Sequence, residues 1–292
     1  MPASSVPDRA GVGASLSAPE RGRARARRRA GGGSGLPGVL VPPAVLAVAF
    51  LLLPLVALLV RAPWGTLPAE LLGPEVRQAL RLSLLCAAAA TVVCLVLGVP
   101  LAWVLARATF PGRRVLRALV TVPLVLPPVV GGVALLMLLG RRGLVGQHLD
   151  AWFGVTLPFT TAAVVVAESF VAMPFLVIAV EGALRGVDRR YEEAAATLGA
   201  SRLTVFRRVT VPTVAPGIAA GAVLCFARAL GEFGATITFA GNFPGVTRTM
   251  PMAVYLALES DPGAAVVLSL VLLAVSVLVL AGLRDRWVPG AT

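Results

Sequence analysis

Few residues in this sequence have side chains that could do chemistry. Lysine is absent, there is one histidine, and there are three cysteines. Without lysine the chain cannot form a standard ATP-binding phosphate loop or a lysine Schiff base. His148 stands alone, and Cys86, Cys94 and Cys225 lie in apolar stretches, where a thiol is usually a small buried hydrophobe. The sequence therefore excludes ATP binding by a standard phosphate loop, catalysis through a lysine Schiff base and a Cys/His zinc cluster of the usual spacing.

The remaining candidates are polar groups inside apolar stretches. Arg228 and Glu232 lie four residues apart, which predicts that they share one face of a helix. Two roles stay open for this pair: an ion pair that fixes helix packing, or a lining group for an anion pathway or its gate. Thr236 and Thr238 follow on the same stretch, and their hydroxyls are candidate donors to an oxyanion. A pathway needs such donors without tight binding, because conduction requires release.

The elements that must position these residues are membrane spans. Of 292 residues, 58% are apolar and 14% are charged, with a mean hydropathy of +0.88. Soluble globular chains have about 45–50% apolar and about 25% charged residues. Backbone groups in lipid must be satisfied internally, so long apolar stretches are helices. The expected fold is an all-α integral membrane protein with six transmembrane helices, at 39–60, 82–106, 118–140, 161–184, 214–240 and 264–283.

Two of these spans have features beyond hydrophobicity. Pro123, Pro127 and Pro128 predict a kink or break in the third span, because proline removes a helical hydrogen bond. The fourth span holds Glu168 and Glu181, which are further candidates for buried charges. Charged groups inside a span are costly and usually functional.

The arginines predict the orientation of the chain. The tail 1–36, the loops 107–117 and 185–213 and the C-terminal tail are all net basic, whereas the other loops are nearly neutral. Basic loops stay in the cytoplasm, so both termini are expected inside, and a count of five or seven spans would break the separation. The net charge of +12 therefore mainly reflects the arginines in the loops and tails that are expected in the cytoplasm.

The sequence predicts one membrane domain between two tails. Residues 1–36 are rich in Gly, Ala, Ser, Pro and Arg and are expected to be a disordered cytoplasmic tail. Its arginine run also suggests nucleic acid. A tail that lies on anionic lipid headgroups is the preferred interpretation, so we expect membrane lipid and no nucleic acid as its partner. The membrane domain covers 37–284, and a short cytoplasmic tail covers 285–292.

The basic loop between spans four and five has a residue pattern that indicates a function. Glu192 and Glu193 begin a short helix, where acidic groups favour the positive N-terminal end, and alanines continue it. Gly199 ends this helix, Ser201 caps a second one, and Pro212 stops the second before the next span. Two short helices joined at a glycine corner, without a catalytic set, form a knob suited to being gripped by another protein.

This loop resembles the EAA loop of ABC-importer permease subunits, whose pattern is E-A-A-x3-G-x9-I-x-L-P. The spacing is kept in full, with valines in place of the isoleucine and leucine, by Glu193, Ala194, Ala195, Gly199, Val209, Val211 and Pro212. The resemblance implies that the loop, with Glu192, forms a coupling helix that inserts into a cleft of a cytoplasmic ATPase subunit. It also implies that Glu193 and Gly199 fix the loop shape, and that the small residues allow close approach. The alternative is an ordinary alanine-rich hairpin.

A second resemblance narrows the class. The stretch 228–259 is similar to the molybdate branch of the sulfate/molybdate permeases. The Gly-Glu-Phe-Gly element at 231–234 and the Ala-Gly-Asn element at 240–242 are shared with sulfate permeases. The Thr-x-Thr-x-Pro element at 247–251 and the Leu-Gly-Arg-Arg-Gly run at 139–143 favour molybdate. Molybdate and tungstate are nearly isosteric, so the sequence does not separate them.

These resemblances imply the permease subunit of an ATP-driven molybdate importer, a multi-pass protein of the cell membrane. The chain is expected to form a homodimer around the pathway, with ATP and Mg²⁺ held by two partner ATPase subunits and no cofactor or metal of its own. An extracytoplasmic molybdate-binding protein would deliver the anion. The alternatives are a sulfate/thiosulfate or tungstate ABC permease. A secondary transporter is less favoured, because no internal repeat is visible and the EAA loop would be unexplained.

Overall fold

The computed structural model describes residues 38–188 and 190–287, and every regular element in this part is helical. The chain divides into two units, 1–56 and 57–292. The boundary lies within helix α2 (Val41–Val60), which is wholly apolar and matches the first expected span. The expected tail 1–36 and residues 288–292 lie outside the described part.

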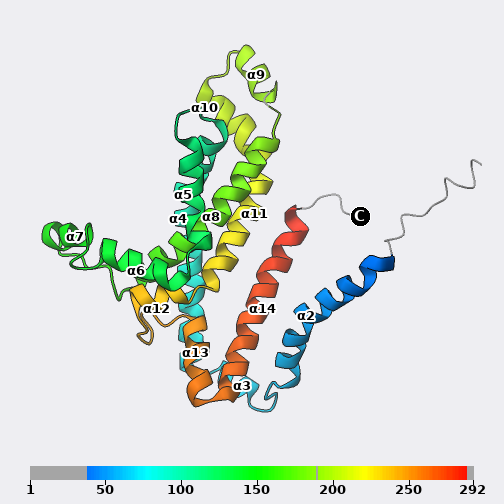
Figure 1. Ribbon diagram of the computed structural model, residues 1–292, viewed down its shortest axis with the longest axis vertical. Helices are drawn as coiled ribbons and strands as arrows, with labels where there is room; N and C mark the ends of the chain where they lie inside the picture. The colour runs from blue at the N-terminus through cyan, green and yellow to red at the C-terminus, as the bar shows by residue number, and fades with distance from the viewer. Residues whose placement is uncertain (1–37, 189, 288–292) are drawn as a thin grey trace, which may run out of the picture. The chain divides into compact units, whose positions relative to one another are not determined.

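Three long helices form the centre of the second unit: α4 (Pro74–Arg107), α8 (Thr161–Gly186) and α11 (Val211–Leu230). Helix α14 (Pro262–Trp287) packs along α11, and Figure 1 shows this arrangement. The core between the three helices is built largely from small residues, which let helix backbones approach closely in a membrane protein. Its fully buried members include Ala87, Ala90, Cys94, Ala102, Ala172, Cys225 and Ala229.

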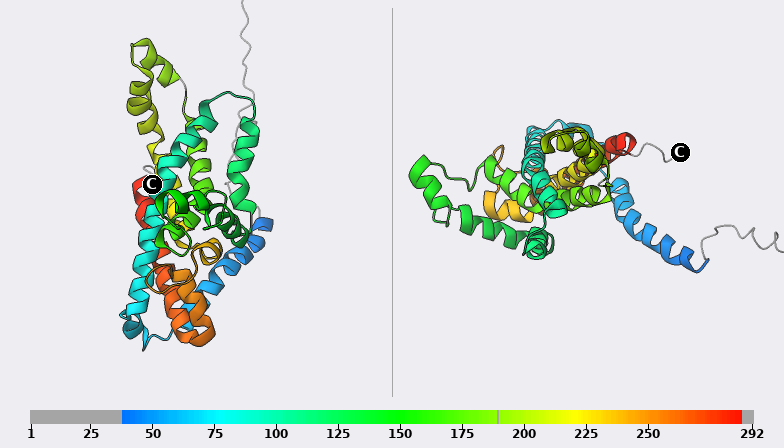
Figure 2. Two further views of the ribbon diagram at one scale, coloured as in Figure 1. Left: turned by 90° about the vertical axis from the view of Figure 1, so that its left-hand side faces the viewer. Right: turned by 90° about the horizontal axis from the view of Figure 1, so that it is seen from above.

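The third expected span is broken where the prolines predicted. Helices α5 (Arg113–Val125) and α6 (Pro128–Leu139) meet at an angle of 115°. Leu126 is extended, with φ −68° and ψ 131°, as expected for a residue before proline. In Figure 2, α6 and the following short helix α7 (Gly146–Phe153) run away from the α4–α8–α11 bundle.

Helix α7 is tied to the end of α6 by a surface ion pair. Arg141 Nε donates to Asp150 Oδ2 at 3.0 Å, and Thr156 Oγ1 donates to Asp150 Oδ1 at 3.2 Å. The hydrogen bond from Arg141 holds the pKa of Asp150 below its usual value. Such an exposed pair orients the arm and adds little to its stability.

The fifth expected span, 214–240, is wrong as a continuous helix. Helix α11 ends at Leu230, and a separate helix α12 (Gly234–Ala240) follows after a three-residue break. The cause is the Gly-Glu-Phe-Gly element: glycine weakens a helix interior, and the Glu232 side chain bonds to backbone beyond it. Arg228 and Glu232 therefore do not share one helix.

The described helices agree with the expected number of spans. Five are long and apolar enough to cross a membrane, or six if the bent pair α5–α6 counts as one span. Helix α4 begins at Pro74, before the expected start at 82, and α14 continues past the expected domain end at 284. The short helices α3 (Leu67–Leu71) and α13 (Met250–Ser260) lie at the end of the unit away from the 185–213 loop (Figure 1).

Candidate functional site

The Arg228–Glu232 pair closes the break between α11 and α12. Arg228 Nη2 lies 2.6 Å from Glu232 Oε2, and Ala235 N donates to Glu232 Oε1 at 2.8 Å. The Glu232 side chain is 1% exposed, whereas that of Arg228 is 27% exposed. One carboxylate thus binds the last turn of α11 and the positive N-terminal end of α12. The packing role of the pair is present, and a partly open guanidinium is compatible with a role at an anion pathway.

The two candidate threonines lie on α12. Thr236 is completely buried, and its Oγ1 has no hydrogen-bond partner among the described residues. Thr238 is half-buried and donates to the carbonyl oxygen of Gly234 at 2.7 Å. Neither hydroxyl lies on an open surface of the single chain.

The two broken spans meet at their short helices, α6 and α12. A Cβ added to Gly132 would lie 2.7 Å from the carbonyl oxygen of Ala235 and 2.7 Å from Thr238 Cβ. A Cβ added to Gly234 would lie 2.9 Å from Pro128 Cβ. Both positions require glycine because backbones approach there, which places the two breaks against one another.

The two glutamates of α8 have opposite surroundings. Glu181 Oε1 accepts from Arg117 Nη2 at 2.6 Å and from Arg185 Nη2 at 2.7 Å. Arg117 also donates to the carbonyl oxygen of Leu105 at the end of α4. Glu168, deeper in α8, is 1% exposed, and its Oε2 has no partner among the described residues. Both residues are buried, but only Glu181 is neutralised by cations.

The 185–213 loop, called the EAA loop from here on, forms the expected glycine corner. Helix α9 (Arg190–Thr197) ends before Gly199, whose φ is +83°. Nothing lies within 4 Å of a Cβ at this position, so the glycine serves the backbone conformation rather than close packing. Ser201 caps helix α10 (Arg202–Val205), because its Oγ accepts from Thr204 N at 3.3 Å. The expectations for both residues are confirmed.

The expected stop at Pro212 is wrong. Helix α10 passes through a π-helical turn (Phe206–Thr210) directly into α11, so that one helical rod runs from Arg202 to Leu230. Pro212 is the second residue of α11 and follows directly after the π-helical turn, so it lies inside the rod without ending it. The second helix of the EAA loop is therefore an extension of a membrane span rather than a separate knob.

Glu192, rather than Glu193, ties the EAA loop to the bundle. Arg107 Nη2 at the end of α4 lies 3.0 Å from Glu192 Oε1, and Thr210 Oγ1 donates to the same oxygen at 2.9 Å. Glu193 is exposed. Sequence reasoning treated Arg107 as a topology charge only and did not single out Thr210, since neither partner is near Glu192 in the chain.

Other matched positions of the EAA loop differ in exposure. Ala194 and Pro212 are exposed, whereas Ala195 and Val209 are half-buried. At the tip, Leu198 is 89% exposed, next to the glycine corner.

A groove of about 570 Å³ lies between the EAA loop and α4. Its walls include Trp103 from α4 and Phe206 from the π-helical turn, whose rings meet edge to face at 5.8 Å. Together with the Glu192 contacts, this aromatic pair joins the loop to two long helices, α4 and α11.

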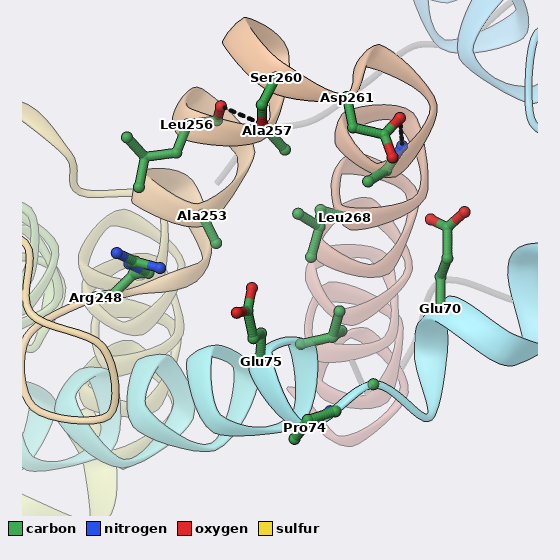
Figure 3. A pocket seen from close by; sticks show the side chains of 13 residues that line it. Glu70, Pro74, Glu75, Arg248, Ala253, Leu256, Ala257, Ser260, Asp261 and Leu268 are labelled. Carbon is green, nitrogen blue, oxygen red and sulfur yellow. Dashed lines mark hydrogen bonds between the residues drawn. The ribbon is translucent and has the colours of Figure 1, made fainter.

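A second pocket, also of about 570 Å³, lies at the opposite end of the unit, beside α3 and α13 (Figure 1), and Figure 3 shows its lining from close by. Glu70, Glu75 and Asp261 line it together with Arg248. Arg248 Nε donates to Asn242 Oδ1 at 3.0 Å, which anchors it to the loop after α12. Three carboxyl groups and one guanidinium are the charged groups of this lining, so the pocket is poorly suited to hold an oxyanion.

A family model described as "Binding-protein-dependent transport system inner membrane component" matches residues 95–289. The chain belongs to this family. It is a permease subunit of the ABC-importer type and a transport component of the membrane, not an enzyme.

Named relatives of this permease belong to molybdenum and sulfate transport systems. It is 51% identical over 251 residues to the molybdenum transport system permease protein ModB of Mycobacterium tuberculosis. The matched residues cover 86% of this chain and 95% of the relative. It is 40% identical over 234 residues to the sulfate transport system permease protein CysT of Salmonella typhimurium, with coverages of 79% and 84%.

Solved structures share the fold of this permease. A bacterial alginate ABC transporter in complex with an alginate-pentasaccharide-bound periplasmic protein contains a chain that matches with a TM-score of 0.70. The match is 17% identical and covers 85% of this chain and 91% of the other. At this identity the likeness concerns the fold alone.

Proposed function

We propose that this chain is the membrane-spanning subunit of an ATP-driven molybdate importer. The observation that carries the proposal is the 51% identity to ModB of Mycobacterium tuberculosis over 95% of its length. The identity to the sulfate permease CysT is lower, at 40%, which makes sulfate or thiosulfate the second candidate. Tungstate is nearly isosteric with molybdate and is included as a third.

The proposed assembly is a homodimer with two ATPase subunits and an extracytoplasmic binding protein. The EAA loop supports the ATPase contact, because it presents Leu198 and a rigid glycine corner at one end of the bundle. This end would lie in the cytoplasm with both termini. The pocket of Figure 3 would then face the binding protein at the outer end. ATP and Mg²⁺ would be held by the ATPase.

The continuous rod from Arg202 to Leu230 suggests how ATP binding would reach the pathway. Movement of the EAA loop would pull this rod, because Glu192 joins the loop to Arg107 and Thr210. The far end of the rod carries Arg228 and stops at the break. Closure of the ATPase would therefore act on the Arg228–Glu232 pair as part of a rigid-body switch.

The same pair suggests how an anion would pass without being trapped. Glu232 neutralises much of the Arg228 charge at 2.6 Å and occupies the positive end of α12. A divalent oxyanion beside the partly exposed guanidinium would therefore be attracted only moderately. Conduction requires binding of this kind, favourable enough for entry and weak enough for release.

The substrate is tested in sealed vesicles that hold this chain with its ATPase and binding protein. We expect ATP-dependent uptake of molybdate, competition by tungstate and little competition by sulfate. Uptake of sulfate in preference to molybdate would replace the proposal by its second candidate. Uptake that persists without the ATPase would favour a secondary transporter.

The coupling role is tested by Gly199→Val and Glu192→Ala, with Glu193→Ala beside them. The first forces a β-branched residue to φ +83°, and the second removes the two contacts that Glu192 makes with Arg107 and Thr210. Both should leave ATP hydrolysis with much reduced uptake, whereas Glu193→Ala, at an exposed position, should act only through the ATPase contact. Gly112→Val is the matched control, because Gly112 has φ +87° and nothing within 4 Å of its Cβ position. Normal uptake in the Gly199 and Glu192 variants would refute the coupling role.

A further inference from the structure

Glu168 is a buried acidic residue to which the proposed transport mechanism gives no role. It lies in the middle of α8, with its side chain on the face shared by Val164, Val171 and Ala172. Val164 and Val171 pack against α12, whereas Ala172 belongs to the α4–α8–α11 core. Glu168 therefore lies where these two apolar clusters join, and only 1% of its surface is exposed.

No cation among the described residues pairs with Glu168. The ionisable groups that interact with it are Cys86 of α4, Cys225 of α11 and Glu232 of the break. Arg228 of α11 is engaged by Glu232, while Arg117 of α5 and Arg185 of α8 are engaged by Glu181. Helices α6 and α12 contain no ionisable residue.

A second buried polar group without a partner among the described residues lies on α12. Thr236 is completely buried, and its Oγ1, like Glu168 Oε2, has no hydrogen-bond partner in the described part of the chain. Helix α12 packs directly against α8. An orphaned carboxyl oxygen and an orphaned hydroxyl thus lie on two packed helices, beside the break.

Electrostatics decides the form in which Glu168 can persist there. A carboxylate without a cation, inside a protein core and near a second carboxylate, would carry a very large desolvation and repulsion cost. An uncharged carboxyl avoids most of that cost and keeps an O–H group that can donate. Two groups that could accept from it are the Glu232 carboxylate in the break and the Thr236 hydroxyl on α12, the helix that packs against α8.

We propose that Glu168 is an uncharged positioning residue that hydrogen-bonds the α11–α12 break, through Thr236 or Glu232, as the break moves during transport. It acts on the Arg228–Glu232 pair and does not touch the transported anion. Whether the Glu168 carboxyl is protonated does not depend on which substrate is transported. Its role in transport, in contrast, rests on the function proposed above.

The state of the carboxyl is tested by infrared spectroscopy on the complete transporter. The difference between wild type and Glu168→Gln should contain the carbonyl-stretch band of one protonated carboxylic acid at neutral pH. Glu181→Gln is the matched control on the same helix, and its difference spectrum should contain a carboxylate band instead, because two arginines hold Glu181. A carboxylate band for Glu168 would overturn the proposal.

The positioning role is tested by uptake and thermal unfolding in vesicles. Glu168→Gln keeps an uncharged donor and should retain uptake with an unchanged pH profile, whereas Glu168→Leu should lower the rate about fivefold, the effect of one net hydrogen bond. Thr236→Val should lower it less after Glu168→Leu than in wild type, because the two changes remove one interaction. Loss of uptake in Glu168→Gln equal to that in Glu168→Leu would overturn the proposal. Absence of molybdate uptake in wild type would reject the proposed substrate and leave the infrared result standing.

Discussion

The molecule contains two broken helices, and they break for different reasons. Between α5 and α6 the break is covalent in origin, because Pro127 and Pro128 hold the preceding residue extended and remove backbone donors. Between α11 and α12 there is no proline, and the break is held by one carboxylate that binds Arg228 and the amide of Ala235.

The difference teaches which break can move. A proline break is present in every state of the chain, so α5–α6 serves as a fixed support. The α11–α12 break depends on an ion pair and a hydrogen bond, which can exchange partners at modest cost. Because α6 and α12 pack against each other through Gly132 and Gly234, the fixed break supports the adjustable one.

The largest expected effect comes from separating the two breaks. In Gly132→Val the new Cβ would lie 2.7 Å from the carbonyl oxygen of Ala235, and backbone cannot rotate away as a side chain can. We expect the free energy of unfolding to fall by more than about 3 kcal/mol, and uptake to fail. Thermal unfolding of the purified chain in detergent measures the loss. Gly182→Ala is the control, since nothing lies within 4 Å of its Cβ position. A stable, active Gly132→Val would show that α6 and α12 do not need close contact.

The second effect concerns the polar break alone. Glu232→Ala removes the partner of Arg228 and the acceptor of Ala235 N together, and leaves a partly buried guanidinium uncompensated. We expect the free energy of unfolding to fall by about 3 kcal/mol in Glu232→Ala, and by less in Glu232→Gln, which keeps an acceptor. Unfolding midpoints of the two variants give the comparison. Equal stability of Glu232→Ala and wild type would mean that the break does not depend on this carboxylate.

The smallest effect is expected at the proline break. Pro127→Ala leaves Pro128 at the start of α6, so the angle of 115° should be kept. We expect the free energy of unfolding to fall by about 1 kcal/mol or less, mainly because the unfolded chain becomes more flexible. Distances between spin labels on α5 and α6 report the angle. A straightened α5–α6 helix in this variant would place the whole break on a single proline and contradict the fixed-support view.

The features that the sequence predicted correctly are local in origin. The positions of the apolar stretches, the proline break, the Gly199 corner and the Ser201 cap each depend on residues within a few positions of one another. Helix periodicity, proline geometry and left-handed glycine are properties of short segments, so they can be derived without tertiary structure. The EAA spacing belongs to the same group, and it was enough to indicate the family.

The errors arose where a distant or polar partner decided the outcome. The 214–240 stretch is apolar enough for one span, but Glu232 can bond ahead to Ala235 N and open the helix. Pro212 was expected to stop a helix, yet the helix continues through a π-helical turn directly before this proline. Glu192 was grouped with Glu193, whereas the end of α4 selects Glu192 as its partner.

The sequence by itself determined an all-helical membrane protein of the ABC-importer permease family, because hydrophobic length and motif spacing are written along the chain. Only the tertiary structure decided how its few charges are used. Glu181 meets two arginines, Glu232 meets one, and Glu168 meets none in the described part of the chain. These three glutamates look alike in an apolar stretch. Arg185 and Arg228 lie only four residues from Glu181 and Glu232 in the chain, whereas helix packing adds Arg117 to Glu181 and brings no cation of the described residues to Glu168.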